Sequence, residues 1–501
     1  NIKKKIIFIL MFFFLIFLFA NNLFSTDISS CQNLGTGTYN LTQNLAINGT
    51  NCLNITGNNV FLDCQNYNIS GNSSGSGIYV SGATANIKNC NIYNFSSGIY
   101  ILSSSNHIIN SVILNYNFYG LNVDTSNSNN FTSITTNYNT YGINLDTTDY
   151  NNLSSITSTY NEYYGFYIYH SDYNNLSLVT ANNNVFGNIV SFNYNNNIQD
   201  SKINTFNFGF NNLQCSNTLK NVSDENNKYH YIFNNENGIS IDGWTNVSSI
   251  TLCNTNTSEF KNMEGSGFGS GSFVYSTFSN NNLFENLNLT NFTIAIGLQN
   301  SDRNNFTNII VNRNNVGFDI GSSSYNNFNS CTIQDNNGDG IQPTWSHYNN
   351  FTNMIITDNG GNGMYYVFYS NYNIIKNSNI SGNTGYNLNF YDSSGSGNGN
   401  LIYNNTLGNI SKIYSNNWND WRISFNYSNL GNIYYNYSGF GNTSFCFDSP
   451  ANYSCDNFAT IIAFPVVVIG SSNSISSLFP FGFESFFLSL ILILSSYFIF
   501  N

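Results

Sequence analysis

A short apolar segment that begins with glycine returns along this chain at a nearly constant interval. In the first half it reads GIYV, GIYI, GLNV, GINL and GFYI, at Gly77, Gly98, Gly120, Gly142 and Gly165, with spacings of 21, 22, 22 and 23 residues. The series resumes with spacings of 20, 23, 23 and 22 at Gly297, Gly317, Gly340, Gly363 and Gly385. A fixed period of this length indicates a repeat architecture.

A second marker keeps the same period. The segment DYNNL begins at Asp149 and returns at Asp172. Related tetrapeptides, SNNF, YNNL, RNNF and YNNF, occur at Ser128, Tyr150, Tyr173, Arg303, Tyr325 and Tyr348. Two markers that stay in phase indicate one structural unit repeated many times.

The period and the residue types favour one architecture. Apolar residues alternate within each unit, as Ile143 and Leu145 do, and this is the periodicity of a β-strand. Leucine-rich repeats would need a recurring L-x-x-L-x-L pattern, and propeller blades are about twice as long. We therefore expect an all-β protein in which each unit is one turn of a right-handed parallel β-helix.

Stacking of the turns explains the recurring residues. Neighbouring turns of such a helix lie about 4.8 Å apart, so equivalent side chains form columns. We expect columns of Ile, Leu and Phe inside, and columns of Asn that bond to one another at the corners. Glycine is expected to supply a positive φ at a corner.

The markers also divide the chain. We expect an N-terminal cap at residues 26–51 and the β-helix at 52–411, which gives about 16 turns at this period. The markers fade over residues 188–296, which we interpret as turns with longer loops. A C-terminal cap at 412–460 and a linker at 461–477 follow.

Both ends of the chain are apolar. Residues 1–25 carry three lysines before a hydrophobic run, as a signal peptide or a signal anchor does. Residues 478–501 fit a transmembrane segment or a processed anchor tail. The sequence therefore predicts an exported protein that is anchored to the membrane at the cell surface.

The composition excludes two classes of protein. The chain of 501 residues is 41% hydrophobic and only 8% charged, whereas soluble globular proteins carry about a quarter charged residues. So much apolar surface argues against disorder. The net charge of -12 argues against binding to nucleic acid.

The nine cysteines fit an oxidising compartment. Cys446 and Cys455 flank a loop that contains proline, and they form the candidate disulfide that we favour. The chain has no CxxC motif and its four histidines are scattered, so no metal site is expected.

Three stretches carry a family resemblance. CQNLGTGTYNLTQNLAINGTNCLNITGNNVFLDCQNYNISG, from Cys31, resembles the entrance of right-handed parallel β-helix repeat proteins of archaeal surfaces. These proteins are related to the NosD-type periplasmic proteins and are pectin-lyase-like. The stretch from Asn227 resembles the interruption that they carry within the helix. The stretch from Gly431 resembles their terminal motif, with Asp448 and Asp456 remaining. The resemblance implies a fold more than a function, because this fold hosts lyases, hydrolases, adhesins and scaffolds.

Two sets of side chains are candidate sites. Acidic residues recur at equivalent positions and form a candidate acidic patch of Asp124, Asp146, Asp149, Glu162 and Asp172. Solvated corner residues, calcium-binding rungs and catalytic carboxylates remain open as interpretations. Tyrosines crowd one turn as candidate glycan-binding residues, Tyr160, Tyr163, Tyr164, Tyr167, Tyr169 and Tyr173. The alternative is that these rings stabilise neighbouring strands.

Sequons for N-glycosylation are frequent in this asparagine-rich chain. The candidates for glycosylation are Asn130, Asn152, Asn175, Asn305 and Asn350.

These observations favour a non-enzymatic rod that acts in adhesion or in cell-envelope interaction. Its expected partners are envelope or extracellular glycans or surface proteins, and no cofactor is expected apart from calcium on the acidic rungs. One alternative is a polysaccharide lyase or hydrolase, and another is a purely structural envelope component.

Overall fold

The computed structural model describes residues 25–185, 187–191, 195–208, 215–267, 271–391, 399–409, 413–415, 432–435, 445–447, 454–456 and 460–462. The chain divides into two compact units, residues 1–462 and 463–501. The second unit lies outside the described residues, as do the predicted membrane tail and the signal segment up to residue 24. In the ranges given above, no helix has the length and hydropathy needed to cross a membrane.

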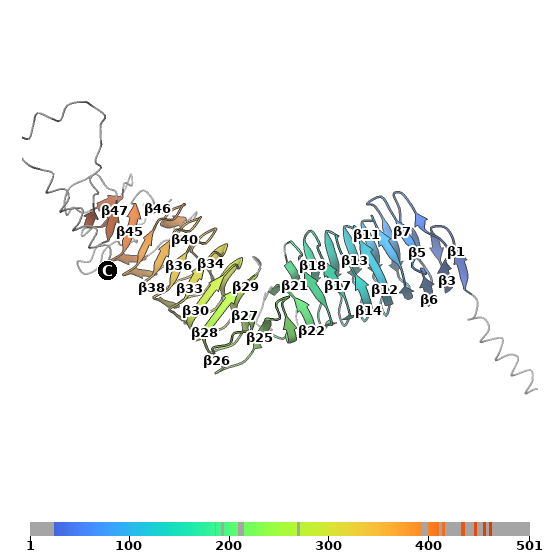
Figure 1. The fold of residues 1–501 in the computed structure, drawn as a ribbon, viewed down its shortest axis with the longest axis horizontal. Helices are drawn as coiled ribbons and strands as arrows, with labels where there is room; N and C mark the ends of the chain where they lie inside the picture. Colours follow the sequence, from blue (N-terminus) through green and yellow to red (C-terminus); the bar gives the residue numbers. More distant parts are fainter. Residues whose placement is uncertain are drawn as a thin grey trace, which may run out of the picture. The chain divides into compact units, whose positions relative to one another are not determined.

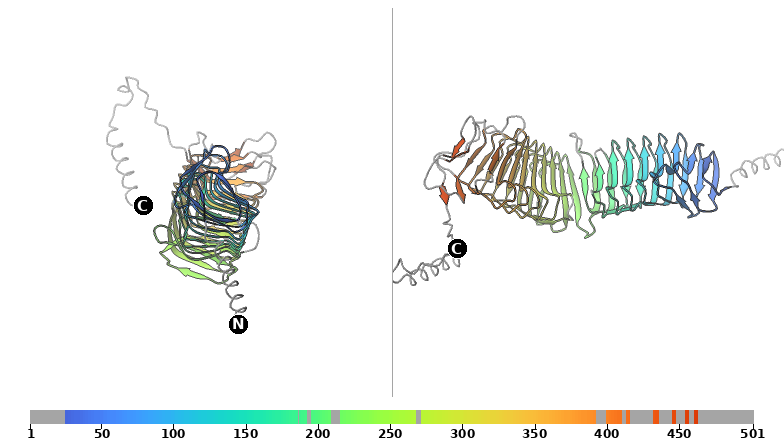
Figure 2. Two further views of the ribbon diagram at one scale, coloured as in Figure 1. Left: turned by 90° about the vertical axis from the view of Figure 1, so that its right-hand side faces the viewer. Right: turned by 90° about the horizontal axis from the view of Figure 1, so that it is seen from above.

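The described chain is a parallel β-solenoid of about 16 turns of about 22 residues, which confirms the predicted fold class (Figure 1). A representative turn consists of β15 (Tyr141–Asp146), β16 (Asn152–Ser154) and β17 (Thr157–Thr159). Each strand pairs in parallel with its equivalent in the next turn, so that Ile143 lies opposite Phe166 and Asn152 opposite Asn175. Figure 2 shows strands of successive turns lying side by side.

The strands form three sheets and a hairpin. The N-terminal sheet has nine strands: β2 (Gln32–Leu34), β5 (Leu53–Ile55), β8 (Ser76–Ser81), β11 (Ser97–Leu102), β13 (Tyr119–Asp124), β15, β18 (Tyr164–Tyr169), β21 (Gly187–Ser191) and β23 (Phe206–Phe208).

The long sheet has 24 strands and runs through both halves of the solenoid. Its first part comprises β1 (Thr26–Ile28), β3 (Gly37–Leu41), β4 (Leu45–Ala46), β6 (Val60–Asp63), β7 (Asn68–Ser70), β9 (Ala85–Lys88), β10 (Asn91–Tyr93), β12 (Ile108–Asn115), β14 (Asn130–Thr135), β16, β17, β19 (Asn175–Ser177), β20 (Thr180–Asn182), β22 (Asn197–Ile203) and β24 (Thr218–Ser223). Its second part comprises β25 (Tyr229–Asn234), β27 (Val247–Cys253), β29 (Ser272–Thr277), β31 (Ile294–Gln299), β34 (Val316–Gly321), β37 (Ile341–Thr344), β40 (Met364–Val367), β43 (Leu388–Tyr391) and β46 (Ile413–Ser415).

The C-terminal sheet has 15 strands: β26 (Ser240–Asp242), β28 (Glu259–Ser266), β30 (Leu283–Thr290), β32 (Asn305–Thr307), β33 (Ile310–Asn312), β35 (Asn327–Asn329), β36 (Thr332–Gln334), β38 (Asn350–Thr352), β39 (Ile355–Thr357), β41 (Ile374–Lys376), β42 (Asn379–Ser381), β44 (Leu401–Tyr403), β45 (Thr406–Asn409), β47 (Ile433–Tyr435) and β50 (Thr460–Ile462). The antiparallel hairpin consists of β48 (Phe445–Phe447) and β49 (Ser454–Asp456).

The interior of each turn is filled by the apolar residues of the alternating pattern. Ile143 and Leu145 of β15, and Phe166 and Ile168 of the next turn, are fully buried. Full burial of such a side chain contributes about 1.5–3 kcal/mol, and the column repeats it at every turn. The alternation also leaves Asn144 and Asp146 on the outer surface of β15.

The repeating glycines are required for space, and the expectation that they supply a positive φ is wrong. A Cβ on Gly98 would lie 2.7 Å from the carbonyl oxygen of Gly120, and one on Gly120 would lie 2.6 Å from that of Gly142. These two glycines therefore make room for the backbone of the following turn, as Gly317, Gly340 and Gly363 also do. The left-handed corners are taken instead by other residues, among them Asn94, Ser128 and Tyr150.

A column of buried asparagines supports the corners from inside, as the sequence predicts for Asn. The backbone N–H of Asn117 donates to Oδ1 of Asn139 at 2.8 Å, and the N–H of Asn139 donates to Oδ1 of Asn161 at 3.0 Å. The Nδ2 of Asn139 donates to the carbonyl oxygen of Leu114 at 2.8 Å. Each amide thus satisfies backbone groups that would otherwise be buried without a partner.

The solenoid is interrupted between β23 and β25, within the region where the sequence markers fade. Here β24 meets β25 in antiparallel orientation through one residue pair, Ser223 with Tyr229. The buried apolar residues form two clusters that divide near this junction, with Cys253 of β27 in the first cluster. The disulfide Cys215–Cys253 joins the two sides.

A buried histidine also spans the junction. The two ring nitrogens of His230 lie 2.7 Å from the carbonyl oxygen of Ile203 and 2.7 Å from the hydroxyl of Ser249. Because a carbonyl only accepts, Nε2 carries the proton and Nδ1 accepts from the serine. His107 has the same tautomer, since the N–H of Ala85 donates to its Nδ1. Burial lowers the pKa of both histidines to about 4.

Replacing Asn139 with Leu is expected to cost about 3 kcal/mol or more of folding free energy, because at least two buried backbone groups lose their partner at about 1–3 kcal/mol each. Asn152→Ala is the matched control. Its amide bonds to Asn130 in an outward-facing ladder, and a surface change of this kind is expected to cost about 0.5 kcal/mol. Urea unfolding of both variants tests this difference, and equal losses would contradict it.

Acidification is expected to destabilise the fold between pH 6.5 and about pH 4 through His107 and His230. Both are neutral in the folded chain, so the unfolded chain binds protons first as the pH falls, and each histidine removes up to about 3 kcal/mol. The unfolding midpoint should depend less steeply on pH across this range in His107→Gln and in His230→Gln than in the wild type. The surface control His170→Gln should keep the wild-type slope. An unchanged slope in both buried variants would contradict the prediction.

Removing the Cys215–Cys253 bridge is expected to loosen the junction. The bridge closes a loop of 38 residues, and chain entropy then contributes about 4 kcal/mol. In Cys215→Ser/Cys253→Ser, hydrogen exchange of β25 and β27 should accelerate more than that of β13 and β15. The pair Cys31→Ser/Cys52→Ser, which removes a bridge from the first turns, should leave β25 and β27 unchanged.

Candidate functional site

The outer surface of the N-terminal sheet gathers tyrosine, asparagine and aspartate in columns, which we call the tyrosine face. Its members are Tyr79, Tyr100, Tyr119, Asn122, Asp124, Tyr141, Asn144, Asp146, Tyr164, Tyr167 and Tyr169. They occupy the outward positions of β8, β11, β13, β15 and β18 and are half-buried.

Three columns run across the tyrosine face. One aligns Tyr119, Tyr141 and Tyr164, a second aligns Tyr79, Tyr100, Asn122, Asn144 and Tyr167, and a third aligns Asp124, Asp146 and Tyr169. The rings of Tyr164 and Tyr167 lie 5.6 Å apart, and those of Tyr167 and Tyr169 lie 6.0 Å apart. The Nδ2 of Asn144 donates to Oδ1 of Asn122 at 2.8 Å.

Four phenols of this face, those of Tyr100, Tyr119, Tyr141 and Tyr167, have a raised pKa and stay protonated. Burial, followed by the carboxylate of Asp124, raises the pKa of Tyr100, whose hydroxyl lies 3.5 Å from that carboxylate. Burial is also the main cause that raises the pKa of Tyr119, Tyr141 and Tyr167. A neutral phenol both donates and accepts hydrogen bonds, so the face offers both functions to a ligand.

The structure brings three of the six predicted tyrosines together on this face. Tyr164, Tyr167 and Tyr169 lie on β18. Tyr163 lies in the bend directly before this strand, with its ring 5.5 Å from that of Tyr141. Sequence reasoning missed Tyr79, Tyr100, Asn122 and Asn144. Strand alternation could have found them, because they stand at outward positions two residues after the repeat glycines.

Tyr160 and Tyr173 belong to corner stacks instead. Tyr160 follows Tyr138 at 5.6 Å with nearly parallel rings, and Tyr173 follows Tyr150 at 4.9 Å. All four have a left-handed backbone, which costs about 1–2 kcal/mol for a residue with a side chain. Ring stacking recovers about 0.5–1.5 kcal/mol per pair. One face of each ring is covered by its neighbour, so these two tyrosines fit the alternative of stabilising adjacent turns.

The predicted acidic patch is divided in the same way. Asp124 and Asp146 lie one turn apart on the tyrosine face. Asp149 and Asp172 lie in the following corner, where Oδ1 of Asp149 accepts the backbone N–H of Asp172 at 2.7 Å, as an asparagine would. Glu162 lies before β18 and accepts a hydrogen bond from the hydroxyl of Thr140 at 3.3 Å.

The cysteines support the prediction of an oxidising environment. Besides the junction bridge, disulfides join Cys31 with Cys52 and Cys64 with Cys90. Cys446 lies opposite Cys455 in the terminal hairpin, while their side chains lie outside the described residues, so this disulfide stays a prediction. Burial raises the pKa of the free thiol of Cys331 to about 12, which makes it a poor nucleophile.

Two further predictions concern the polar residues. The candidate glycosylation residues stand in outward asparagine ladders, in which Asn152 donates to Asn130 and Asn175 donates to Asn152, and Asn305 and Asn350 flank Asn327. Their modification stays a prediction. Among the described residues, no group of three or more His, Cys, Asp or Glu side chains is placed to hold a metal ion.

Comparison with known proteins agrees with this fold. Residues 272–436 match the family model described as right handed beta helix region, and no curated protein matches the chain. The more specific likeness to NosD-type and archaeal proteins stays a prediction.

Solved structures of similar fold share 11% identity with the chain. The A-module of mannuronan C-5 epimerase AlgE6 from Azotobacter vinelandii has a TM-score of 0.29, with 74% of this chain and 85% of that chain covered. The periplasmic alginate epimerase AlgG has a TM-score of 0.27, with 74% and 84% covered. The catalytic domain of a GH87 alpha-1,3-glucanase has a TM-score of 0.20, with 69% and 60% covered.

Proposed function

We propose that this right-handed β-helix protein is exported, tethered to the membrane by its C-terminal tail, and binds uncharged glycans on its tyrosine face without altering them. The disulfides support an oxidising, extracellular environment. Binding to glycans would then serve adhesion or contact with the cell envelope.

The observation that carries the proposal is the mixture of groups on the tyrosine face. The half-buried ring of Tyr167 lies one turn from Asn144, and Asn122 follows in the same column. The ring of Tyr164 lies 5.6 Å from that of Tyr167. Aromatic rings can pack against the apolar faces of sugar rings, while neutral phenols, amides and carboxylates hydrogen-bond to hydroxyl groups. The columns present similar groups at each turn, which suits a chain of repeating units.

Charge selects among glycans. Asp124 and Asp146 lie on the face, and the sequence has no Lys or Arg between residues 89 and 201. A polyanionic glycan would therefore meet like charges with no nearby cation in this stretch, and its approach would be disfavoured at low ionic strength. An uncharged glycan meets no such penalty.

Hydrolysis of a glycan is the alternative function for which the tyrosine face offers named residues. Asp124 and Asp146 pair across adjacent turns, a spacing of about 4.8 Å, and retaining glycosidases hold two carboxyl groups about 5–5.5 Å apart. Such enzymes need two carboxyl groups in unlike environments, one acid and one nucleophile. Here both are half-buried and accept the hydroxyl of the following threonine, Thr125 at 2.7 Å and Thr147 at 3.0 Å. Asp124 has one further contact, a long one of 3.5 Å to the hydroxyl of Tyr100. The otherwise similar environments favour binding over catalysis.

The double variant Tyr167→Ala/Asn144→Ala is expected to weaken binding of an uncharged oligosaccharide at least tenfold, which corresponds to about 1.4 kcal/mol. A glycan screen on the full chain selects the oligosaccharide, and calorimetry measures its affinity. Tyr160→Ala, which changes a corner stack, is the control and should bind as the wild type does.

Three outcomes would contradict the proposal. Binding of no glycan at all would favour a purely structural envelope component. Equal loss of binding in the control would assign the effect to folding. If the wild type releases reducing ends from a glycan and Asp146→Asn does not, the protein is a hydrolase.

A further inference from the structure

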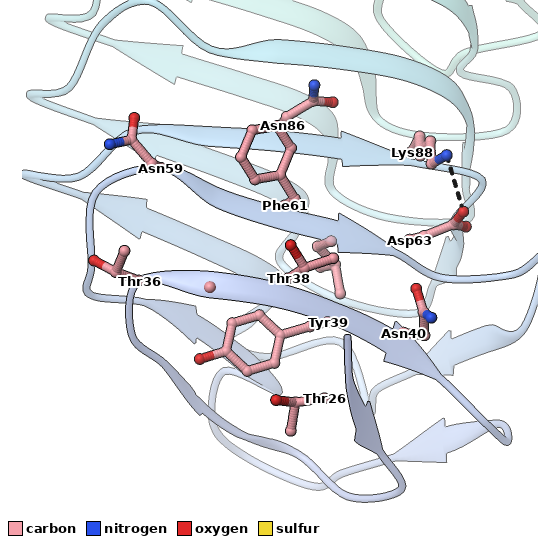
Figure 3. Close-up of a pocket in the computed structure, with 12 residues that line it drawn as sticks. Thr26, Thr36, Thr38, Tyr39, Asn40, Asn59, Phe61, Asp63, Asn86 and Lys88 are labelled. Atoms are coloured by element: carbon pink, nitrogen blue, oxygen red, sulfur yellow. Dashed lines mark ion pairs between the residues drawn. The ribbon is translucent and has the colours of Figure 1, made fainter. Parts of the chain in front are cut away.

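A hollow of about 770 Å³ lies on the first turns of the solenoid, outside the tyrosine face (Figure 3). It is formed on the long sheet by β1, β3, β6 and β9. Its lining includes Asn59, Phe61, Asp63, Asn86 and Lys88. Ligand pockets commonly measure about 300–1,000 Å³, so this hollow has room for one or two sugar rings.

Phe61 stands at an outward position of β6, between two buried residues of the alternating strand, and is 49% exposed. Its neighbours in the same column are Thr38 and Asn86. Exposed tyrosines elsewhere, such as Tyr138 and Tyr150, stack on the ring of an adjacent turn. No described aromatic ring covers Phe61 in this way, so packing between turns does not account for it. An uncovered aromatic ring surrounded by amides can pack against a sugar ring.

An ion pair borders the same hollow (Figure 3). The Nζ of Lys88 lies 3.1 Å from Oδ2 of Asp63. Oδ1 of Asp63 accepts the N–H of Gln65 at 2.9 Å and the Nδ2 of Asn89 at 3.0 Å. Burial acts to raise the pKa of Asp63, but these hydrogen bonds and Lys88 outweigh it and hold the pKa below its ordinary value. The carboxylate therefore stays charged and fixed.

The two partners of the ion pair differ in their access to a ligand. The side chain of Asp63 is only 15% exposed, whereas that of Lys88 is 52% exposed. An ammonium group has three N–H donors, and one is directed at Asp63. Lys88 is the only Lys or Arg between residues 6 and 201, and it lines the same hollow as the uncovered ring of Phe61.

We propose that this hollow is a second, separate saccharide site, which takes an uncharged mono- or disaccharide with one pyranose ring packed on Phe61. The remaining N–H groups of Lys88 and the amides of Asn59 and Asn86 bond to its hydroxyl groups. Asp63 balances the charge of Lys88, and the chain as a whole carries a net charge of -12. This balance favours an uncharged sugar over an acidic one.

The site is independent of the proposed function. It lies on β6 and β9 of the long sheet, whereas the tyrosine face lies on the N-terminal sheet. It is also confined to four strands of the first turns and the residues adjoining them, so it suits a single unit or a chain end, while the columns of the tyrosine face suit an extended chain.

Saccharide binding to the full chain tests the inference. The probes are methyl glycosides of uncharged hexoses and N-acetylhexosamines, their disaccharides, and a hexuronate of matched size. Phe61→Ala is expected to weaken binding of an uncharged probe at least tenfold, and Lys88→Gln is expected to weaken it severalfold. Both positions are on the surface, and circular dichroism and the unfolding midpoint verify that each variant is folded.

Two controls separate this site from the rest of the molecule. Ile108→Ala changes a residue of similar exposure, 44%, in the same column as Phe61 but outside the hollow, and it should bind as the wild type does. Tyr167→Ala/Asn144→Ala should also retain binding here, even if it abolishes binding of longer glycans.

The inference is overturned if no uncharged probe binds, or if binding survives in Phe61→Ala. Loss of binding in Tyr167→Ala/Asn144→Ala but not in Phe61→Ala would assign every saccharide to the tyrosine face. Tighter binding of the hexuronate, reduced by salt and by Lys88→Gln, would overturn the choice of an uncharged ligand.

Discussion

Parallel backbone pairing between each turn and the next is the constraint on which the rest of this structure depends. Pairing in register places equivalent residues about 4.8 Å apart, so every side chain must be compatible with a copy of its own position above and below. Apolar residues meet this condition inside the solenoid, as Ile143 and Phe166 do. Amides meet it at the buried corners, because Asn117 and Asn139 bond to the next turn.

The same constraint acts on the backbone. A side chain does not fit at a repeat glycine such as Gly120, because the carbonyl oxygen of Gly142 in the following turn lies too close. At the left-handed corners a tyrosine such as Tyr138 is tolerated because rings of adjacent turns stack. Space, rather than backbone freedom, therefore decides where glycine recurs.

The fold could be predicted from the sequence because residues such as Gly120 and Gly142 recur at the length of one solenoid turn. The candidate site could be predicted only in part. Tyr164, Tyr167 and Tyr169 lie together, but Tyr160 and Tyr173 do not, because the crowded turn passes two corners that local sequence does not place in space. The hollow at Phe61 depends on pairing between β1, β3, β6 and β9, although one signal was visible: a phenylalanine at the outward position of an alternating strand.

The exchange of sheets at the junction has a consequence for how ligands can follow the surface. Before the junction, the strands that carry the repeat glycine lie in the N-terminal sheet, as β15 does; after it, their equivalents lie in the long sheet, as β34 does. The columns of side chains on the N-terminal sheet therefore end at β23, the last strand of that sheet. Recognition surfaces on the two halves can accordingly diverge in evolution without disturbing each other, and a polymer that tracks one column must end its contact where that column ends.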